Sequence, residues 1–330
     1  MSLLQYAIGA NYKLYFQKLK KIAREEKKCY PLLVLDTVWC TLRYGIVMTD
    51  YRNYKIYNRS HKERKEYVGA GGEDKLYNIV SPAKYKKRYT IKPDFMRDFA
   101  AYTKRECIIP GRDSYEEFCA FLDRNPVCMK KPYDGLGGAS VEKIRTAEIT
   151  DRKAFYDHAA ENRIFLEELV KQHPDMNVLC PTSVNTIRMM TLNDRGTPRL
   201  LWAGLRVGNG VNAVDNFHAE GMGVKIDLET GKLVGKGINK DNVAFDTHPT
   251  TGVVFDGFQI PCFQEAKELV LKAALESDKI LVVGWDVAIS ENGPLVIEGN
   301  RRPGFDLVQV LDDRGRMDIA RQAIASVKGK

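Results

Sequence analysis

The sequence lacks the patterns that mark several common classes of protein. Its seven cysteines are scattered and no two have CxxC spacing, which argues against a disulfide framework and against a structural zinc site. The longest apolar stretch, residues 32–48, contains Asp36 and Arg43 and falls short of the roughly 20 residues of a membrane span, so it predicts a buried amphipathic helix. No basic segment leads into an apolar run at the amino terminus, so we expect no signal peptide and a cytoplasmic location.

Positive charge is unevenly distributed along the chain. Of its 330 residues, the first 90 hold 19 Lys and Arg against 8 Asp and Glu, together with 12 of the 16 tyrosines. Such a segment suits contact with a polyanion, an anionic membrane surface or a phosphorylated substrate, and a solvated face above packed tyrosines explains it equally well. It contains no recognisable helix-turn-helix, RRM or zinc module, so we expect no nucleic-acid partner.

The order of periodic segments predicts a mixed α+β chain built from hairpins rather than repeated βαβ units. A loop is expected at Gly69–Asp74. Asp94 is expected to cap a helix running to about Arg105, and Ser114 with Glu117 forms a capping box. The other helices are expected over residues 11–28, 33–47, 151–161, 263–277 and 317–327, and strands over 127–131, 141–144, 163–170, 185–192, 200–207, 222–227, 233–236, 280–289 and 294–300.

Two apolar strands near the carboxyl end carry acidic residues. If they pair as a hairpin about Asn292, Asp286 lies opposite Glu298, and Asn300 shares the face of Glu298 because strand side chains alternate. Buried carboxylates without a positive partner are costly, and hard oxygen donors suit Mg²⁺ or Mn²⁺. The pattern predicts a metal site, with an exposed hairpin end as the alternative.

A second motif joins lysines to a Gly-rich turn. Lys131 ends a predicted strand, and the turn that follows lets backbone N–H groups approach phosphate oxygens. Neither a Walker A loop nor a dinucleotide fingerprint is present, and a simple glycine hairpin remains the alternative. A third motif, residues 165–170, is an apolar strand that ends in Glu167 and Glu168. Its free backbone groups suit the edge of an adenine, although taken alone the motif favours an acidic strand end in solvent.

The serial order of these motifs resembles that of ATP-grasp enzymes: Lys92, Lys131-Pro132 with its Gly-rich turn, Glu167-Glu168, and Asp286 followed by Glu298 and Asn300. Residues 184–188, 204–208, 214–218, 284–288 and 298–304 are similar to the sugar-transfer-associated branch. The resemblance implies an ATP-grasp fold of two α+β subdomains that clamp ATP. We expect a basic, mainly helical region at 1–90, a small subdomain with the Gly-rich lid at 91–180, and a metal-binding subdomain at 181–330.

The resemblance also implies a role for each matching residue. ATP phosphates would be held by the two lysines and the Gly-rich turn, the adenine by the hinge, and two Mg²⁺ ions, or Mn²⁺, by the acidic hairpin. Asp175 is the candidate for the ribose, and arginines would stabilise charge on the transferred group. The predicted nucleotide-binding set is Lys92, Lys131, Gly135, Gly137, Gly138, Ser140, Glu167, Glu168, Leu169, Val170 and Asp175; the metal set is Asp286, Glu298 and Asn300; the catalytic or substrate set is Arg188, Arg206, Arg302 and His218.

The implied reaction joins a carboxylate to an amine through an acyl phosphate, with ADP as product. The branch name points to cell-surface polysaccharide or natural-product pathways, such as addition of an amino acid to a sugar acid. A phosphotransferase acting on a hydroxyl is the main alternative, and a nucleotide-binding assembly factor is a third. His218 is a candidate base, and a loop histidine bonded to backbone explains it equally well. Arg301, Arg302 and Gln309 follow the metal motif closely enough to touch substrate.

Overall fold

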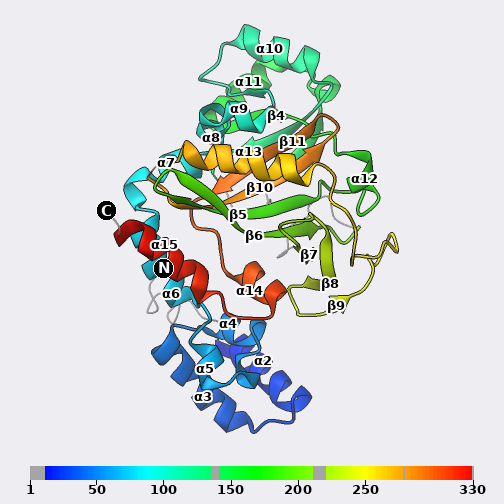
Figure 1. The fold of residues 1–330 in the computed structure, drawn as a ribbon. Coiled ribbons are helices and arrows are strands. Elements are labelled where there is room, and N and C mark those ends of the chain that lie inside the picture. The colour runs from blue at the N-terminus through cyan, green and yellow to red at the C-terminus, as the bar shows by residue number, and fades with distance from the viewer. Residues whose placement is uncertain (1–11, 135–140, 211–220, 278, 329–330) are drawn as a thin grey trace.

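The computed structural model describes residues 12–134, 141–210, 221–277 and 279–328, which form two antiparallel sheets with helices around them (Figure 1). The smaller sheet has the strand order β1-β4-β2-β3 and the larger one β11-β10-β5-β6-β7-β8-β9. Within the described residues, all neighbouring strands of the two sheets pair antiparallel, as the hairpin pattern predicted. The fold is therefore mixed α+β, and the sites of interest lie where the two sheets meet.

The basic amino-terminal region is helical, in agreement with the prediction. Its hydrophobic core is rich in tyrosine, because the rings of Tyr51, Tyr54 and Tyr67 are buried beneath the charged surface. In Figure 1 the helices α2 to α5 form the blue end of the molecule, farthest from α10 and α11. The elements are α2 (Tyr12–Glu25), α3 (Tyr30–Tyr44), α4 (Met48–Asn53), η1 (Ile56–Asn58), α5 (His61–Arg64), α6 (Ala70–Val80), η2 (Ala83–Tyr85) and α7 (Lys87–Thr90).

The smaller sheet is covered by two helices. Ser114 caps α10 through the predicted capping box, with its hydroxyl accepting from the Glu117 N–H and the Glu117 carboxylate accepting from the Ser114 N–H. The carboxylate of Asp151 caps α11 by accepting from the Ala154 N–H. The elements of this part are α8 (Lys92–Asp98), α9 (Ala100–Thr103), β1 (Cys107–Ile108), α10 (Tyr115–Arg124), β2 (Val127–Pro132), β3 (Glu142–Arg145), η3 (Thr146–Glu148), α11 (Arg152–Glu161), β4 (Ile164–Glu168) and α12 (Pro174–Asn177).

The larger sheet has two differently covered faces. Alternate residues of its central strand, such as Trp285 and Val287, pack with helix α13 in the largest core. The residues between them, such as Val282, face α6, α14 and α15. Asp286 points to this second face, since it alternates with Trp285 and Val287. The elements are β5 (Thr186–Asp194), β6 (Thr197–Val207), β7 (Met222–Ile226), β8 (Leu233–Asn239), β9 (Ala244–Phe245), α13 (Phe263–Leu275), β10 (Val282–Ser290), β11 (Gly293–Asn300), α14 (Asp306–Asp312) and α15 (Met317–Lys328).

Three predictions about local structure were wrong. The expected loop at Gly69–Asp74 is the first part of α6, with Gly69 as its N-cap. Asp94 does not cap its helix: α8 begins at Lys92, one turn earlier, and α8 and α9 are separated at Phe99. The expected buried helix, α3, buries Leu33, Thr37 and Cys40 but leaves its opposite face exposed. In each case tertiary packing, which the local sequence does not record, decided the outcome.

Among the residues described, we find no helix that combines the length and the apolar character needed to cross a membrane.

Candidate active site

The first cluster of the site is built on the β10–β11 hairpin. Asp286 and Glu298 are direct cross-strand partners, as the folding of the hairpin predicted. Near the turn, the register pairs Val287 with Val296, and a bulge between Asp286 and Val287 shifts it by one residue. This bulge brings the two acids opposite each other. Bulges of this kind re-aim side chains and are frequent beside active sites.

Two arginines from the neighbouring strands neutralise Asp286. Arg188 of β5 holds both of its carboxylate oxygens, the second at 3.0 Å, and Arg206 of β6 donates to Oδ2 at 3.0 Å. Burial alone would raise the pKa of Asp286, but the two guanidinium groups outweigh it and hold that pKa below its usual value. Asp286 is therefore ionised despite being 3% exposed.

Glu298 lacks this compensation. Burial, and then the neighbouring charge of Asp286, raise the pKa of Glu298 above its usual value. The amide nitrogen of Asn300 donates to Glu298 at 3.4 Å, which places both side chains on one face of β11. Two carboxyl groups in contact, only one of them matched by arginine, leave room for an added positive charge.

The second cluster lies on the smaller sheet around Glu167. This carboxylate, 3% exposed, accepts from the Lys131 ammonium at 2.5 Å and from the Arg105 guanidinium at 2.7 Å. Burial would raise the pKa of Glu167, but Arg105 and Lys131 hold it below its usual value. Arg105 also donates to the carbonyl oxygens of Val296 and Ile297 at 3.4 and 3.3 Å. It therefore binds the smaller sheet to the strand that carries Glu298.

Lys92 joins the two clusters. Burial, the main cause, lowers the pKa of its ammonium, and the charges that act on it include Glu298, Lys131 and Glu167. Its backbone N–H donates to the carbonyl of Tyr133 at 3.0 Å, beside the start of the Gly-rich turn. The structure thus brings together, around Lys92, residues that are far apart in the sequence.

Two glycines of the sequence motifs permit this close arrangement. A Cβ atom at Gly299 would lie 2.8 Å from the ring of Phe95, which packs α8, and with it Lys92, against β11. A Cβ atom at Gly284 would lie 2.6 Å from Pro303, so glycine lets the segment after β11 cross the sheet beside Arg188. The glycines therefore set the distance between elements.

The residues of the predicted adenine hinge lie in different surroundings. Glu167 is a buried ion-pair partner. Glu168 is hydrogen-bonded to the backbone of Glu106: the Glu106 carbonyl accepts from the Glu168 N–H, and the Glu106 N–H donates to the Glu168 carboxylate. Leu169 and Val170 follow β4 and are partly exposed, which leaves their roles at the adenine as predictions. Asp175 lies on the short helix α12 with an exposed carboxylate near His173. Its role at the ribose also stays a prediction.

The arginines after the metal motif face the amino-terminal helices. Arg302 donates to the carboxylate of Asp74 at 3.0 Å and to Asn78, while Arg301 donates to the carbonyl of Ser81. The side-chain amide of Gln309 accepts from the Val68 N–H and donates to the Val68 carbonyl. These contacts connect the segment to α6 and do not test a substrate role for Arg302.

Two carboxyl groups of the amino-terminal region, Asp50 and Glu73, have raised pKa values and interact with the segment that follows β11. Burial, which outweighs two backbone hydrogen bonds, raises the pKa of Asp50 to about 7. Burial likewise raises the pKa of Glu73 to about 8, with Asp306 and Asp50 as contributing charges. Glu73 still accepts a hydrogen bond from the Phe305 N–H at 2.7 Å. This part of the site is thus acidic and partly protonated near neutral pH.

Five predicted site residues lie outside the described residues. They are Gly135, Gly137, Gly138 and Ser140 of the turn, and His218.

Sequence reasoning missed two features. Arg105 was read only as the end of a helix, because its partners are distant in sequence. Cys180 lies beside His248, whose hydrogen bond, with those of Thr182 and Ser183, outweighs burial and lowers the pKa of the thiol to about 6. Cys180 and His248 are fully buried, and both imidazole nitrogens of His248 form hydrogen bonds to backbone groups. We therefore assign the pair no role as a nucleophile.

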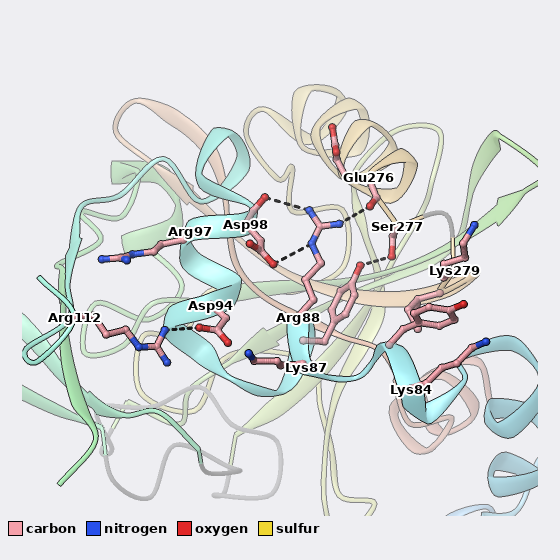
Figure 2. Close-up of a pocket in the computed structure, with 13 residues that line it drawn as sticks. Lys84, Lys87, Arg88, Asp94, Arg97, Asp98, Arg112, Glu276, Ser277 and Lys279 are labelled. Carbon is pink, nitrogen blue, oxygen red and sulfur yellow. Dashed lines mark hydrogen bonds and ion pairs between the residues drawn. The ribbon is translucent and has the colours of Figure 1, made fainter. Parts of the chain in front are cut away.

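A cavity of about 640 Å³ lies apart from the carboxylate site. It lies between α7, α8 and the carboxyl end of α13, the helix that covers the face of the large sheet opposite Asp286. Figure 2 shows Arg112 on Asp94, and Arg88 between the carboxylate of Asp98 and the backbone carbonyl of Glu276. A nucleotide held by Lys92 and Lys131 would bind elsewhere.

The donor set fits a divalent cation. Glu298 and Asn300 present oxygen atoms on one face, and a cation there would relieve the repulsion that raises the Glu298 pKa. No group of three or more His, Cys, Asp or Glu side chains suited to a metal occurs among the described residues. Two carboxylates and an amide suit Mg²⁺, which usually keeps several waters and phosphate oxygens as its other ligands.

The sequence matches the model of the sugar-transfer associated ATP-grasp family over residues 112–324. The chain belongs to this family, which confirms the resemblance stated above. The matched segment contains every residue of the two clusters except Lys92 and Arg105. No curated protein matches the chain.

Several solved structures resemble the fold at low identity. The ATP-grasp ligase PsnB, complexed with a minimal precursor, is 15% identical with a TM-score of 0.46, and the match covers 75% of this chain and 63% of PsnB. The D-cycloserine synthetase DcsG is 12% identical with a TM-score of 0.44, covering 84% and 82%. The D-alanine-D-alanine ligase of Coxiella burnetii is 14% identical with a TM-score of 0.42, covering 81% and 63%. The chain thus spans less than two thirds of PsnB.

Proposed function

We propose that the protein is an ATP-dependent carboxylate–amine ligase that works through an acyl phosphate. The observation that carries the proposal is the meeting of the two clusters at Lys92. There, two lysines, a pair of carboxyl groups with an amide and two arginines converge from two sheets. Phosphoryl transfer needs positioning and charge neutralisation of this kind and no nucleophile from the protein.

Each cluster then has a part in binding. Lys92 and Lys131 would bind the triphosphate, and Glu167 and Arg105 fix the position of Lys131. Asp286, Glu298 and Asn300 would hold Mg²⁺, which would supply neutralising charge between the phosphate oxygens. Arg188 and Arg206 lie on strands beside the metal ligands, where they would orient the acceptor carboxylate and stabilise negative charge on it.

The reaction itself has two steps. A carboxylate oxygen of the first substrate attacks the γ-phosphorus, the bond to the β-phosphate oxygen breaks, and ADP leaves. The amine nitrogen then attacks the acyl carbon, phosphate leaves, and the amine loses a proton to give the amide. The family's link to sugar transfer makes sugar acids the first carboxylates to try.

The test is ATP consumption with Mg²⁺ across a panel of sugar acids and amino acids, with ADP, AMP and phosphate resolved. ADP and free phosphate that appear only when acid and amine are both present are the expected result. ADP without phosphate, formed with a single acceptor, would assign the site to a phosphotransferase. AMP formation would contradict the proposed acyl phosphate. Replacement of Asp286 by Asn without loss of activity would contradict the metal assignment.

A further inference from the structure

The outer face of helix α3 exposes a row of large apolar side chains. Each is between 50% and 79% exposed. At 100° per residue they span an arc of about 120° on one side of the helix. We call this row the α3 ridge; it consists of Leu32, Leu35, Val38, Trp39 and Leu42. Soluble proteins expose single apolar residues routinely, but a contiguous row marks a surface that binds another apolar surface.

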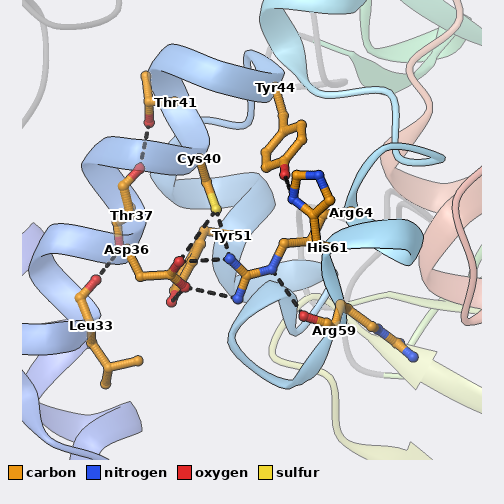
Figure 3. Close-up of polar contacts among 10 residues, drawn as sticks. All are labelled: Leu33, Asp36, Thr37, Cys40, Thr41, Tyr44, Tyr51, Arg59, His61 and Arg64. Carbon is orange, nitrogen blue, oxygen red and sulfur yellow. Dashed lines mark hydrogen bonds and ion pairs between the residues drawn. The ribbon is translucent and has the colours of Figure 1, made fainter.

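The ridge is held rigidly in its outward position. On the inner face of α3, the carboxylate of Asp36 binds the Arg64 guanidinium through two contacts, at 2.6 and 2.9 Å, and accepts from the Tyr51 hydroxyl at 2.7 Å (Figure 3). Leu33 and Cys40 are buried on the same side. The helix therefore cannot rotate to bury the ridge without breaking these bonds in the interior of the region.

The region that carries the ridge has an excess of exposed positive charge. Lys27 precedes α3, and Arg43 borders the arc in its last turn. Across residues 12–69, the exposed cations are nine and the exposed acids three; the cations are Lys13, Lys20, Lys21, Arg24, Lys27, Arg43, Lys55, Lys62 and Lys65, and the acids Glu25, Glu26 and Glu63. Two of these acids are engaged locally, Glu63 with Ser60 and Glu25 with Lys21.

We propose that the α3 ridge docks the protein on an anionic lipid bilayer. The ridge would enter the headgroup–acyl boundary, and the exposed lysines and arginines of the region would contact phospholipid phosphates. An apolar face with Trp and Leu, flanked by cations, is the pattern of interfacial helices. A second copy of the chain fits less well, because pairing through α3 would bring two strongly basic regions together. The proposal rests on α3 and is independent of the proposed reaction.

The test is co-sedimentation of the full chain with vesicles of phosphatidylcholine, with and without phosphatidylglycerol. We expect binding only to the anionic vesicles, weakened by high salt. The variant Leu35→Glu/Leu42→Glu should lose at least about tenfold in partition coefficient, since each change removes an apolar side chain and adds a negative charge. Val254→Glu is the matched control, because Val254 is 57% exposed outside the region. ATP turnover in solution should be the same for all three proteins.

Tryptophan fluorescence gives a direct readout. Of the three tryptophans, Trp202 and Trp285 are buried, so a blue shift on addition of vesicles would report Trp39. The proposal would be overturned if the wild type did not bind anionic vesicles, or if the double variant bound them as well as the wild type. It would also be overturned by sedimentation showing a dimer that Leu35→Glu/Leu42→Glu dissociates, which would assign the ridge to a second copy.

Discussion

The two charged clusters of the site differ in how completely they are neutralised. Around Glu167, one buried carboxylate faces two cations, and its pKa is lowered. Around Asp286, two arginines compensate one carboxylate, while the second, Glu298, has a raised pKa. Removal of Arg105 from the first cluster should therefore damage stability, and removal of a group from the second should damage chemistry. A buried carboxyl group whose charge is not compensated is typical of a site that binds a cation.

The largest effect expected is that of Glu298→Gln on turnover. We expect a loss of about a thousandfold, or ~4 kcal/mol in transition-state stabilisation, because the bound cation would lose a charged ligand. ADP formation under saturating Mg²⁺ is the measurement. Glu291→Gln, at an exposed acid of the same hairpin, is the control and should retain full activity. Similar activity in the two variants would remove Glu298 from the metal site.

Arg105→Met should have the largest effect on stability. It leaves the buried Glu167 with one cation and the carbonyls of β11 without a donor, so we expect the free energy of unfolding to fall by ~3 kcal/mol. Urea denaturation measures it. The control is Arg124→Met, whose ion pair with Glu106 is exposed and worth under ~1 kcal/mol. The double variant Arg105→Met/Glu167→Gln should recover part of the loss, and no recovery would contradict the charge argument.

The two neighbouring lysines of β2 give a more selective comparison. Lys131 binds Glu167 inside the site, whereas Lys130 pairs with the exposed Glu142 of β3. We expect Lys131→Met to raise the KM for ATP by about tenfold or more, since it removes a point charge from the phosphates. Lys130→Met should leave KM within about twofold of the wild type. Equal KM values for the two variants would place the nucleotide elsewhere.

The smallest effect expected is a pH dependence of stability from Glu73. Its pKa is raised from 4.5 to about 8 in the folded protein. The wild type should therefore lose stability as the pH rises between these values, because the unfolded chain ionises first. Glu73→Gln keeps an acceptor for the Phe305 N–H and removes this loss, so we expect a gain of roughly 1–2 kcal/mol at pH 8 and none near pH 4. Thermal unfolding at both pH values checks it; a pH-independent gain would contradict the raised pKa.

Much of the large sheet could be predicted from the sequence. The strands alternate clearly, and the apolar hairpin between Gly284 and Asn300 was enough to place Asp286 opposite Glu298. The capping box of Ser114 and Glu117 was local and was also found. What failed depended on packing: whether α3 would be covered, where α8 would begin and whether glycines 69, 71 and 72 would join a helix. The pairing of Arg105 with Glu167 was invisible for the same reason, since 62 residues separate them.

The contacts of Arg105 have a mechanical consequence. Its guanidinium holds a carboxylate of the small sheet and two carbonyls at the edge strand of the large one. Any opening of the gap between the sheets that keeps the two bonds to β11 must be a rotation centred on this side chain, because a straight separation would break both of them. Arg105 would thus act as the pivot of the clamp, and the far end of the small sheet, around α10 and α11, would sweep the widest path.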